Sequence, residues 1–214
     1  MPKRKPGLRA AQKEATGKAV LEAAREEFER VGFEAANLRA IAARARVSAG
    51  TVLHHYGDKR ELLHAALFDD LDETLRRALA EPGTGPLETQ LSKLTRTVFQ
   101  YYQQRPKLSR TLLKESLFAD EPWARKFNAQ VHMVHGALAR LAEEASARGE
   151  LRPGVDGAVF AVAYFSFFYF ALISWVQGAH GSPEALVEHL VRQHLEGLRP
   201  IRKPLRNPPR RSDP

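Results

Sequence analysis

The residues with the clearest chemical meaning lie between Asn37 and Lys59. Their pattern predicts two short helices joined by a tight turn, with Asn37 and Ser48 as the N-caps of the two helices. Val52 and Tyr56 are i,i+4 partners and are expected to face inward, which leaves the other side of the second helix free. A turn of this length allows the second helix to enter the major groove of double-stranded DNA. The segment therefore predicts a helix-turn-helix that reads a DNA operator.

We expect DNA contacts from both helices and from the turn. Thr51 and His54 are predicted to read base edges, while cations and polar groups around them position the phosphate backbone. The candidate DNA-binding residues are Asn37, Arg39, Arg44, Arg46, Ser48, Ala49, Thr51, His54, His55, Tyr56 and Lys59. Lys59 and Arg60 open the next helix, where the helix dipole disfavours cations, so we expect a phosphate to be their partner. The alternative is that both are ordinary solvated charges.

In order and spacing, this segment resembles the DNA-binding domain of the TetR (tetracycline-repressor-like) family of transcriptional regulators. The matching pieces are Ile41-Ala42, Val47-Ser48, Gly50-Thr51, His54-His55-Tyr56, and Lys59 with Glu61-Leu62. The sequence departs from the family pattern at Arg46, where Gly is common, at Ala49, where Lys is frequent, and at Leu53, where Tyr is usual. The resemblance implies an N-terminal DNA-binding domain followed by a ligand-sensing domain that dimerises.

Basic residues are concentrated at the two ends of the chain. Residues 1–13 carry five cations and no acid, and residues 199–214 carry six cations and one acid. Because the whole chain has a formal net charge of +8, the part between these ends is slightly acidic. The N-terminal arm is expected to lie along DNA phosphates, whereas the Pro-rich C-terminal tail is expected to be disordered. Solvated, non-binding ends are the alternative for both.

The helical periodicity of the remaining sequence predicts an all-α fold of about nine helices. The first helix is expected from about Thr16 to Val31, and the break at 81–86 separates the fourth helix from the fifth. We predict a basic arm at 1–13, a three-helix DNA-binding domain at 14–62, a larger ligand-binding and dimerisation domain at 63–198, and a basic tail at 199–214. A chain of 214 residues is long enough for both domains.

Two C-terminal helices are expected to support dimerisation. The segment 157–183 contains no charged residue and is long enough to span a membrane, but Tyr164, Ser166 and Gln177 interrupt its apolar run. We therefore expect one face toward a ligand cavity, another toward a second subunit, and no membrane partner; a membrane-associated regulator is the alternative. The last helix carries an apolar stripe typical of a four-helix dimer interface. Its members are Leu186, Val187, Leu190, Val191, Leu195 and Leu198.

The aromatic content of the second half predicts a cavity for a small, mostly apolar effector. The candidate ligand-binding residues are Phe99, Tyr102, Phe118, Trp123, Phe127, His132, Met133, His135, Phe165 and Tyr169. His132 and His135 have a spacing that two metal ligands could share, but no third ligand stands at helical spacing, so we expect polar contacts to the effector and no metal.

Several functional classes do not fit this sequence. The chain has no Cys, which excludes thiolate metal sites, disulfides and cysteine nucleophiles, and no phosphate-binding glycine loop is present. We therefore expect neither an enzyme nor a bound cofactor. The N-terminal residues lack a secretory signal, so a cytoplasmic location is expected. The sequence predicts a homodimeric, ligand-responsive repressor of an inverted-repeat operator, with a sequence-neutral basic DNA-binding protein as an alternative.

Overall fold

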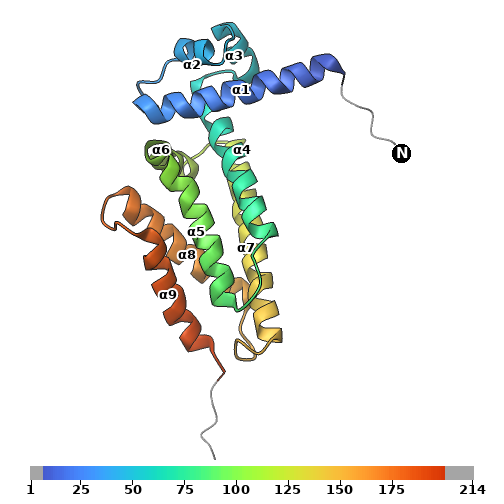
Figure 1. Cartoon of the computed structure of the whole chain (residues 1–214), viewed down its shortest axis with the longest axis vertical. Coiled ribbons are helices and arrows are strands. Elements are labelled where there is room, and N and C mark those ends of the chain that lie inside the picture. Colours follow the sequence, from blue (N-terminus) through green and yellow to red (C-terminus); the bar gives the residue numbers. More distant parts are fainter. Residues whose placement is uncertain (1–6, 201–214) are drawn as a thin grey trace, which may run out of the picture.

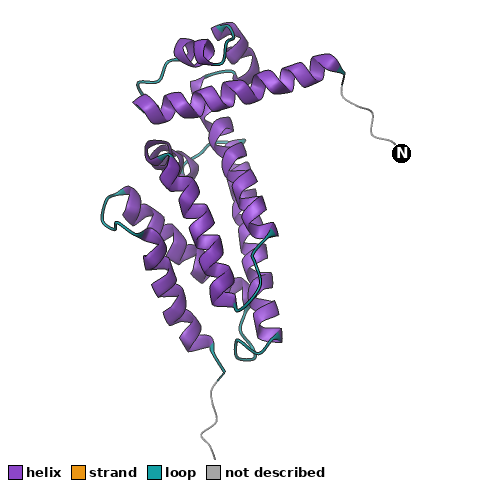
Figure 2. Cartoon of the chain, in the orientation of Figure 1, coloured by secondary structure: helices purple, strands orange, loops and turns teal. Residues whose placement is uncertain are grey.

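A computed structural model describes residues 7–200 of the chain. Within this range the protein is all helical, with two groups of helices joined by one long helix (Figures 1 and 2). The helices are α1 (Leu8–Val31), α2 (Leu38–Arg44), α3 (Ala49–Tyr56), α4 (Lys59–Ala80), α5 (Leu87–Gln104), α6 (Pro106–Leu117), α7 (Trp123–Ala147), α8 (Gly157–Val176) and α9 (Pro183–Leu198). The predicted fold class and the nine helices are confirmed for this part of the chain.

The first three helices form a small domain with its own core. α1 packs against α2 and α4, and α2 packs against α3. Val20, Phe28, Ile41 and Val52 are buried at their meeting point, and the Phe33 ring lies 5.6 Å from that of Phe28. Burying side chains of this size contributes roughly 1.5–3 kcal/mol each, which stabilises the placement of two helices as short as α2 and α3.

Helix α1 begins earlier than the sequence indicated. We expected it to begin at about Thr16, with the preceding residues in an extended arm, but it is helical from Leu8. The residues between are mostly Ala, Gln, Lys and Glu, which favour helix, and Thr16 lies inside the helix instead of capping it. Residues 10–15 are exposed and project beyond the small domain (Figure 1). The other predicted arm residues, 1–6, lie outside the described range.

Helix α4 connects the two groups of helices. Asp58 caps it by accepting hydrogen bonds from the backbone N–H groups of Arg60 and Glu61, as the sequence predicted. Its first turns pack against α1 and α3, and the helix also packs against α5, α6 and α7. α4 is continuous across residue 62, where the sequence placed a domain boundary, so the two domains share this helix. A displacement of α4 therefore moves the small domain relative to the larger one.

Helix α8 packs against α7, α9 and α6 in the larger domain. It is a helix long and apolar enough to cross a membrane by length and composition. Phe160, Tyr164 and Leu172 are nevertheless buried, and the Tyr164 hydroxyl lies 2.7 Å from that of Thr95 on α5. A Cβ atom at Gly157 would lie 2.9 Å from the Ala139 carbonyl oxygen, so glycine permits the close approach of α7 and α8. These contacts pack one face of α8 into the core of the larger domain.

The apolar stripe of α9 is divided between two environments. Val187, Val191 and Leu195 are buried within the chain itself, where α9 packs against α5 and α8. Leu186, Leu190 and Leu198 are only partly buried. Half of the predicted dimer stripe thus belongs to the monomer's own core. Sequence periodicity identifies the apolar face of a helix but not the partner that covers it. On α8, the exposed large apolar side chains are Val159, Val162 and Phe170.

Candidate nucleic-acid interface and ligand cavity

Both predicted N-caps of the helix-turn-helix are formed. The Asn37 side chain accepts a hydrogen bond from the Arg39 backbone N–H at 2.7 Å, and the Ser48 hydroxyl accepts one from the Thr51 N–H at 3.0 Å. Such caps contribute about 1 kcal/mol each. In the turn between the helices Arg46 has a φ of 57°, in the left-handed region where glycine is favoured. The turn therefore has the backbone shape that glycine would give it, but with a cationic side chain.

The exposed face of α3 carries few polar groups. His54 and Leu53 are exposed, whereas Ala49, Thr51 and His55 are partly buried. The Thr51 hydroxyl lies 2.9 Å from the Ser48 hydroxyl, so it is shared with the cap. Leu53 was not among the predicted DNA-binding residues, although its position beside His54 on the free face could have been read from the helical spacing.

Tyr56 fixes the orientation of α3 against α1. Its hydroxyl donates a hydrogen bond to the Gly17 carbonyl oxygen at 3.0 Å, and the ring is partly buried. A Cβ atom at Gly17 would lie 3.3 Å from this hydroxyl, so glycine leaves room for the contact. Tyr56 was expected to face inward and also to contact DNA. The structure gives its hydroxyl a partner inside the domain.

Lys59, for which we expected a phosphate partner, has partners within the chain; its contact with DNA stays a prediction. The Lys59 ammonium donates hydrogen bonds to the carbonyl oxygens of Phe33, Glu34 and Ala36, at 2.9, 3.1 and 3.3 Å, and lies over the Phe33 ring. These three bonds use all the donors of an ammonium group. Lys59 thus holds the α1–α2 connection to the start of α4, which explains a cation at this unfavourable position without DNA.

Two more cations near α2 and α4 are paired with acids. Arg44 lies 2.9 Å from the carboxylate of Glu26 on α1. Arg60, for which we also expected a phosphate, lies 3.4 Å from the carboxylate of Glu115 on α6. Among the described residues, Arg39 and Arg46 are exposed and have no acid within 4.0 Å. The free positive charge near α3 therefore comes from the first helix of the motif and from the turn.

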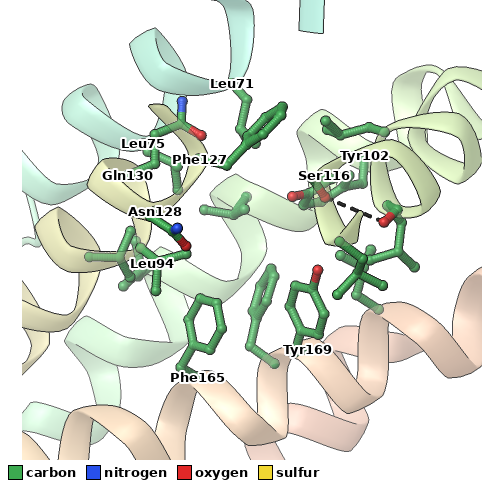
Figure 3. A pocket seen from close by; sticks show the side chains of 18 of the residues that line it. Leu71, Leu75, Leu94, Tyr102, Ser116, Phe127, Asn128, Gln130, Phe165 and Tyr169 are labelled. Carbon is green, nitrogen blue, oxygen red and sulfur yellow. Dashed lines mark hydrogen bonds between the residues drawn. The ribbon is translucent and has the colours of Figure 1, made fainter. Parts of the chain in front are cut away.

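The larger domain contains a cavity of about 330 Å³ between α4, α5, α6, α7 and α8 (Figure 3). Its lining includes no Asp, Glu, Lys, Arg or His, so neutral side chains form the whole wall. The lining residues are Leu71, Leu75, Leu79, Leu94, Val98, Tyr102, Leu112, Leu113, Ser116, Leu117, Phe127, Asn128, Gln130, Val131, Val134, Tyr164, Phe165, Phe168, Tyr169 and Leu172. A volume of this size is at the lower end of the range for small-molecule sites.

Comparison with known proteins agrees with this architecture. Residues 20–66 match the family described as "Bacterial regulatory proteins, tetR family". The chain is 31% identical to the HTH-type transcriptional repressor KstR of Rhodococcus jostii over 169 residues, which cover 78% of this chain and 74% of that protein. The chain belongs to the TetR family. The predicted family, with transcription regulation through a DNA-binding helix-turn-helix, is confirmed.

Further relatives of this TetR-family regulator cover most of its length. The HTH-type transcriptional repressor NicS of Pseudomonas putida is 26% identical and covers 79% of this chain and 82% of that protein. The structure of Thermus thermophilus FadR in complex with lauroyl-CoA has a TM-score of 0.63 at 24% identity and covers 90% of this chain and 99% of that one. Bacillus subtilis FadR in complex with stearoyl-CoA has a TM-score of 0.70 at 17% identity, with coverages of 85% and 98%.

Four predicted ligand-binding residues of this regulator line its cavity: Tyr102, Phe127, Phe165 and Tyr169. The other six do not line this cavity, so their contact with an effector stays a prediction. Phe99 is buried against Phe168, and Trp123 donates a hydrogen bond from Nε1 to the Glu61 carboxylate at 2.8 Å. Phe118 is 79% exposed at the end of α6.

The two histidines and the methionine of α7 lie on other faces of that helix. The α7 lining residues are Phe127, Asn128, Gln130, Val131 and Val134. His132, Met133 and His135 are not among them and lie on other faces of α7. His132 is exposed, and the other two are partly buried. The described residues contain no group of three potential metal ligands. The polar wall consists instead of Tyr102, Ser116, Asn128, Gln130, Tyr164 and Tyr169, most of which the sequence reasoning missed.

The joint between the two domains holds a buried histidine. His64 on α4 is 3% exposed, its ring neighbours are Trp123 and Phe127, and neither ring nitrogen has a hydrogen-bond partner. The nearest carboxylate oxygen, on Glu115 of α6, is 3.6 Å from Nε2. Burial lowers the pKa of His64, although Glu115 opposes this shift. Because Phe127 also lines the cavity, the cavity wall is in contact with the first turns of α4 through this cluster.

Proposed function

We propose that this TetR-family protein is a homodimeric repressor that binds an inverted-repeat operator and responds to a small, largely apolar effector. The observation that carries the proposal is the coupling of two features by one helix. The helix-turn-helix with its exposed α3 face and the neutral cavity both contact α4. An effector that displaces α4 changes the separation of two DNA-binding domains in a dimer, and hence their fit to two half-sites.

For operator recognition, we propose that Thr51 and His54 read bases and that Arg39 and Arg46 contact phosphates. The exposed Leu53 adds an apolar group suited to the methyl group of thymine. Asn37, Ser48, Ala49, His55, Tyr56 and Arg44 keep the two helices in position or approach the backbone. The exposed start of α1, with Lys13, extends the basic surface toward neighbouring phosphates.

For dimerisation, we propose the exposed face of α8 together with the partly buried side chains of α9. Val159, Val162 and Phe170 are 65%, 52% and 56% exposed and recur at helical spacing. Apolar side chains of this size on one face are typical of a surface that a second copy covers.

For the effector, we propose a molecule whose apolar part enters the cavity and whose charges, if any, stay outside. The neutral lining offers no counterion, and burying an unpaired charge costs several kcal/mol. The acyl-CoA complexes of the two FadR structures suggest one candidate class, with the acyl chain inside and the phosphates at the surface. A ligand at 100 times its dissociation constant adds about 2.7 kcal/mol to stability, so thermal shifts with lauroyl-CoA test this class.

Selection of bound sites from random DNA by the purified full-length protein tests the operator proposal. We expect an enriched inverted repeat whose half-sites are about one helical turn of DNA apart, or a multiple of that spacing. Enrichment of no sequence would contradict the proposal and favour a sequence-neutral basic DNA-binding protein. A single half-site would contradict the dimer. Recovery of the protein only with detergent-extracted membranes would favour the membrane-associated alternative.

A further inference from the structure

Helices α4 and α7 are linked by side-chain hydrogen bonds at two heights. Near the DNA-binding domain, Trp123 Nε1 donates to the Glu61 carboxylate at 2.8 Å. About two turns further along α7, Gln130 Nε2 donates to the Phe68 carbonyl oxygen and to Asp72 Oδ1, both at 3.3 Å. The second link is the one that touches the cavity, because Gln130 is a lining residue and is only 5% exposed.

Gln130 therefore belongs both to the cavity wall and to the contact between α7 and α4. Figure 3 shows its amide at the α4 side of the cavity, near Leu71 and Leu75 of α4. A molecule in the cavity meets this amide and the apolar side chains of α4 on the same wall. Among the lining residues on α7, Gln130 is the one whose side chain is hydrogen-bonded to α4.

The hydrogen bonds from Gln130 to α4 are easily exchanged. At 3.3 Å they are longer than the usual 2.9–3.0 Å for N–H···O bonds. Both acceptor groups have other partners. The Asp72 carboxylate accepts from Arg76 Nε at 2.6 Å through its other oxygen, Oδ2, and the Phe68 carbonyl lies inside a helix, where the i+4 N–H also donates to it. When Gln130 turns away, the Phe68 carbonyl keeps its helical partner and the Asp72 carboxylate keeps its bond to Arg76 through Oδ2, so α4 loses a tie to α7 while each group retains one partner.

We propose that Gln130 reads a neutral oxygen atom of the effector and transmits this contact to α4. The effector class is an apolar body with one carbonyl or hydroxyl oxygen near Gln130. That oxygen accepts the Nε2 hydrogen atoms, the amide leaves Phe68 and Asp72, and α4 is released from α7 at this height. An apolar molecule without the oxygen fills the same space but leaves the tie in place. This inference rests on the proposed ligand-responsive function, and Gln130 acts in it as a specificity-determining and positioning residue.

The first test uses variants without any ligand. Gln130→Met keeps the length of the side chain and removes both hydrogen bonds, so operator affinity is expected to fall about 5–10-fold while the thermal midpoint changes little. The exchange Gln130→Glu with Asp72→Asn restores a bond of opposite direction, from the introduced amide on α4 to the introduced carboxylate on α7, and is expected to recover most of that affinity. Gln103→Met is the matched control, because it makes the same substitution at an exposed glutamine of α5 that does not line the cavity.

The second test uses two probes of nearly equal shape, 2-acetylnaphthalene and 2-ethylnaphthalene. Both are expected to bind the wild-type protein within about fivefold of each other, but the ketone is expected to lower operator affinity at least tenfold and the hydrocarbon less than twofold. In Gln130→Met this difference disappears. Equal effects of the two probes, no binding of the ketone, or wild-type operator affinity in Gln130→Met would each overturn the proposal.

A readout without DNA separates this inference from the operator proposal. With the ketone bound, hydrogen exchange of the α4 amides around Phe68 and Asp72 is expected to accelerate in the wild type and to stay unchanged in Gln130→Met. If the wild-type protein selects no operator but shows this exchange pattern, the proposed function fails while the Gln130 contact stands. If it selects an operator and the exchange pattern is absent, the Gln130 inference alone fails.

Discussion

Arg46 combines two opposing properties at one position of the helix-turn-helix. Among the described residues it is the only one other than glycine with a positive φ, at 57°. A side chain in this region costs roughly 1–2 kcal/mol compared with glycine. The side chain is also exposed and, like that of Arg39, has no acid within 4.0 Å in the part of the chain that the structure describes. The chain thus keeps a strained backbone at the position of an exposed cation.

Replacing Arg46 is expected to separate these two properties. Arg46→Gly relieves the Cβ conflict and is expected to raise the free energy of unfolding by about 1 kcal/mol. The lost cation is expected to weaken operator binding and to reduce the slope of log K against log salt by about one unit. Arg46→Ala is the control: it removes the charge, keeps the Cβ atom and gives the same change of slope without the gain in stability. An unchanged slope in both variants would exclude a phosphate contact.

Lys59 is expected to act on stability and not on the salt dependence of DNA binding. Its ammonium bonds to three carbonyl oxygens, and hydrogen bonds from charged donors contribute about 1.5–3 kcal/mol before exposure to solvent reduces them. Lys59→Met should therefore lower the free energy of unfolding by about 1–2 kcal/mol, measured by urea denaturation. The salt slope of operator binding should stay the same. A loss of one unit of slope at unchanged stability would restore the phosphate contact that the sequence suggested.

At the scale of single elements, capping signals predicted helix ends well. Asn37, Ser48 and Asp58 cap α2, α3 and α4 as expected, because a side-chain acceptor there bonds backbone N–H groups within the next three residues. The start of α1 was missed because no such side chain marks it: Gly7 occupies the N-cap position without a side-chain bond. The sequence therefore predicts a helix end where a side chain caps it, and misses one where no side chain does.

The cavity was harder to predict for a physical reason. A helix that is apolar on several faces, such as α8, gives no periodic signal for which face meets a cavity and which meets another helix. Phe99 and Phe165 are both aromatic residues of the larger domain, but Phe99 packs on Phe168 while Phe165 lines the cavity. The contribution of α4, through Leu71, Leu75 and Leu79, depends on packing between distant segments.

The junction of α4, α6 and α7 is expected to weaken in mild acid because of His64. Burial lowers its pKa in the folded protein, so the unfolded chain binds a proton more readily. The charged groups that face it are Glu115 from α6 and Arg60 and Glu61 from α4 itself. The stability from the neutral form is complete above the unfolded pKa of about 6.5 and is lost as the pH falls below it, by at most about 1.4 kcal/mol per pH unit.

His64→Leu removes this proton-binding group and is expected to flatten the decline in stability between about pH 7.5 and 5.5. The measurement is urea denaturation of both proteins across this range. His189→Leu, which replaces an exposed histidine of α9, is the control. Identical pH profiles for wild type and His64→Leu would show that His64 does not titrate in this window.

At the scale of the whole molecule, the helix-turn-helix and the exposed apolar face of α8 lie on separate sides of the protein. The helix-turn-helix forms one end, α4 leads from it into the larger domain, and α8 and α9 lie together away from α4 (Figure 1). This arrangement leaves the apolar face of α8 free while the cavity lies between α8 and α4. A second copy on α8 would thus be linked to DNA binding through the walls of the cavity.

A charge on the face of α8 is expected to separate the dimer without unfolding the protomer. Val162 is 52% exposed, so Val162→Glu places a carboxylate in water in the monomer but in an apolar contact in the dimer. Sedimentation should show a monomer at concentrations where the wild type is a dimer. Affinity for the full inverted repeat should fall about 100-fold or more, because two linked half-site contacts become independent, while affinity for one half-site is kept.

Ala129→Glu, at an exposed position of α7, should change neither property. A dimeric Val162→Glu protein with full operator affinity would place the interface elsewhere, and a wild type that sediments as a monomer would exclude the dimer itself.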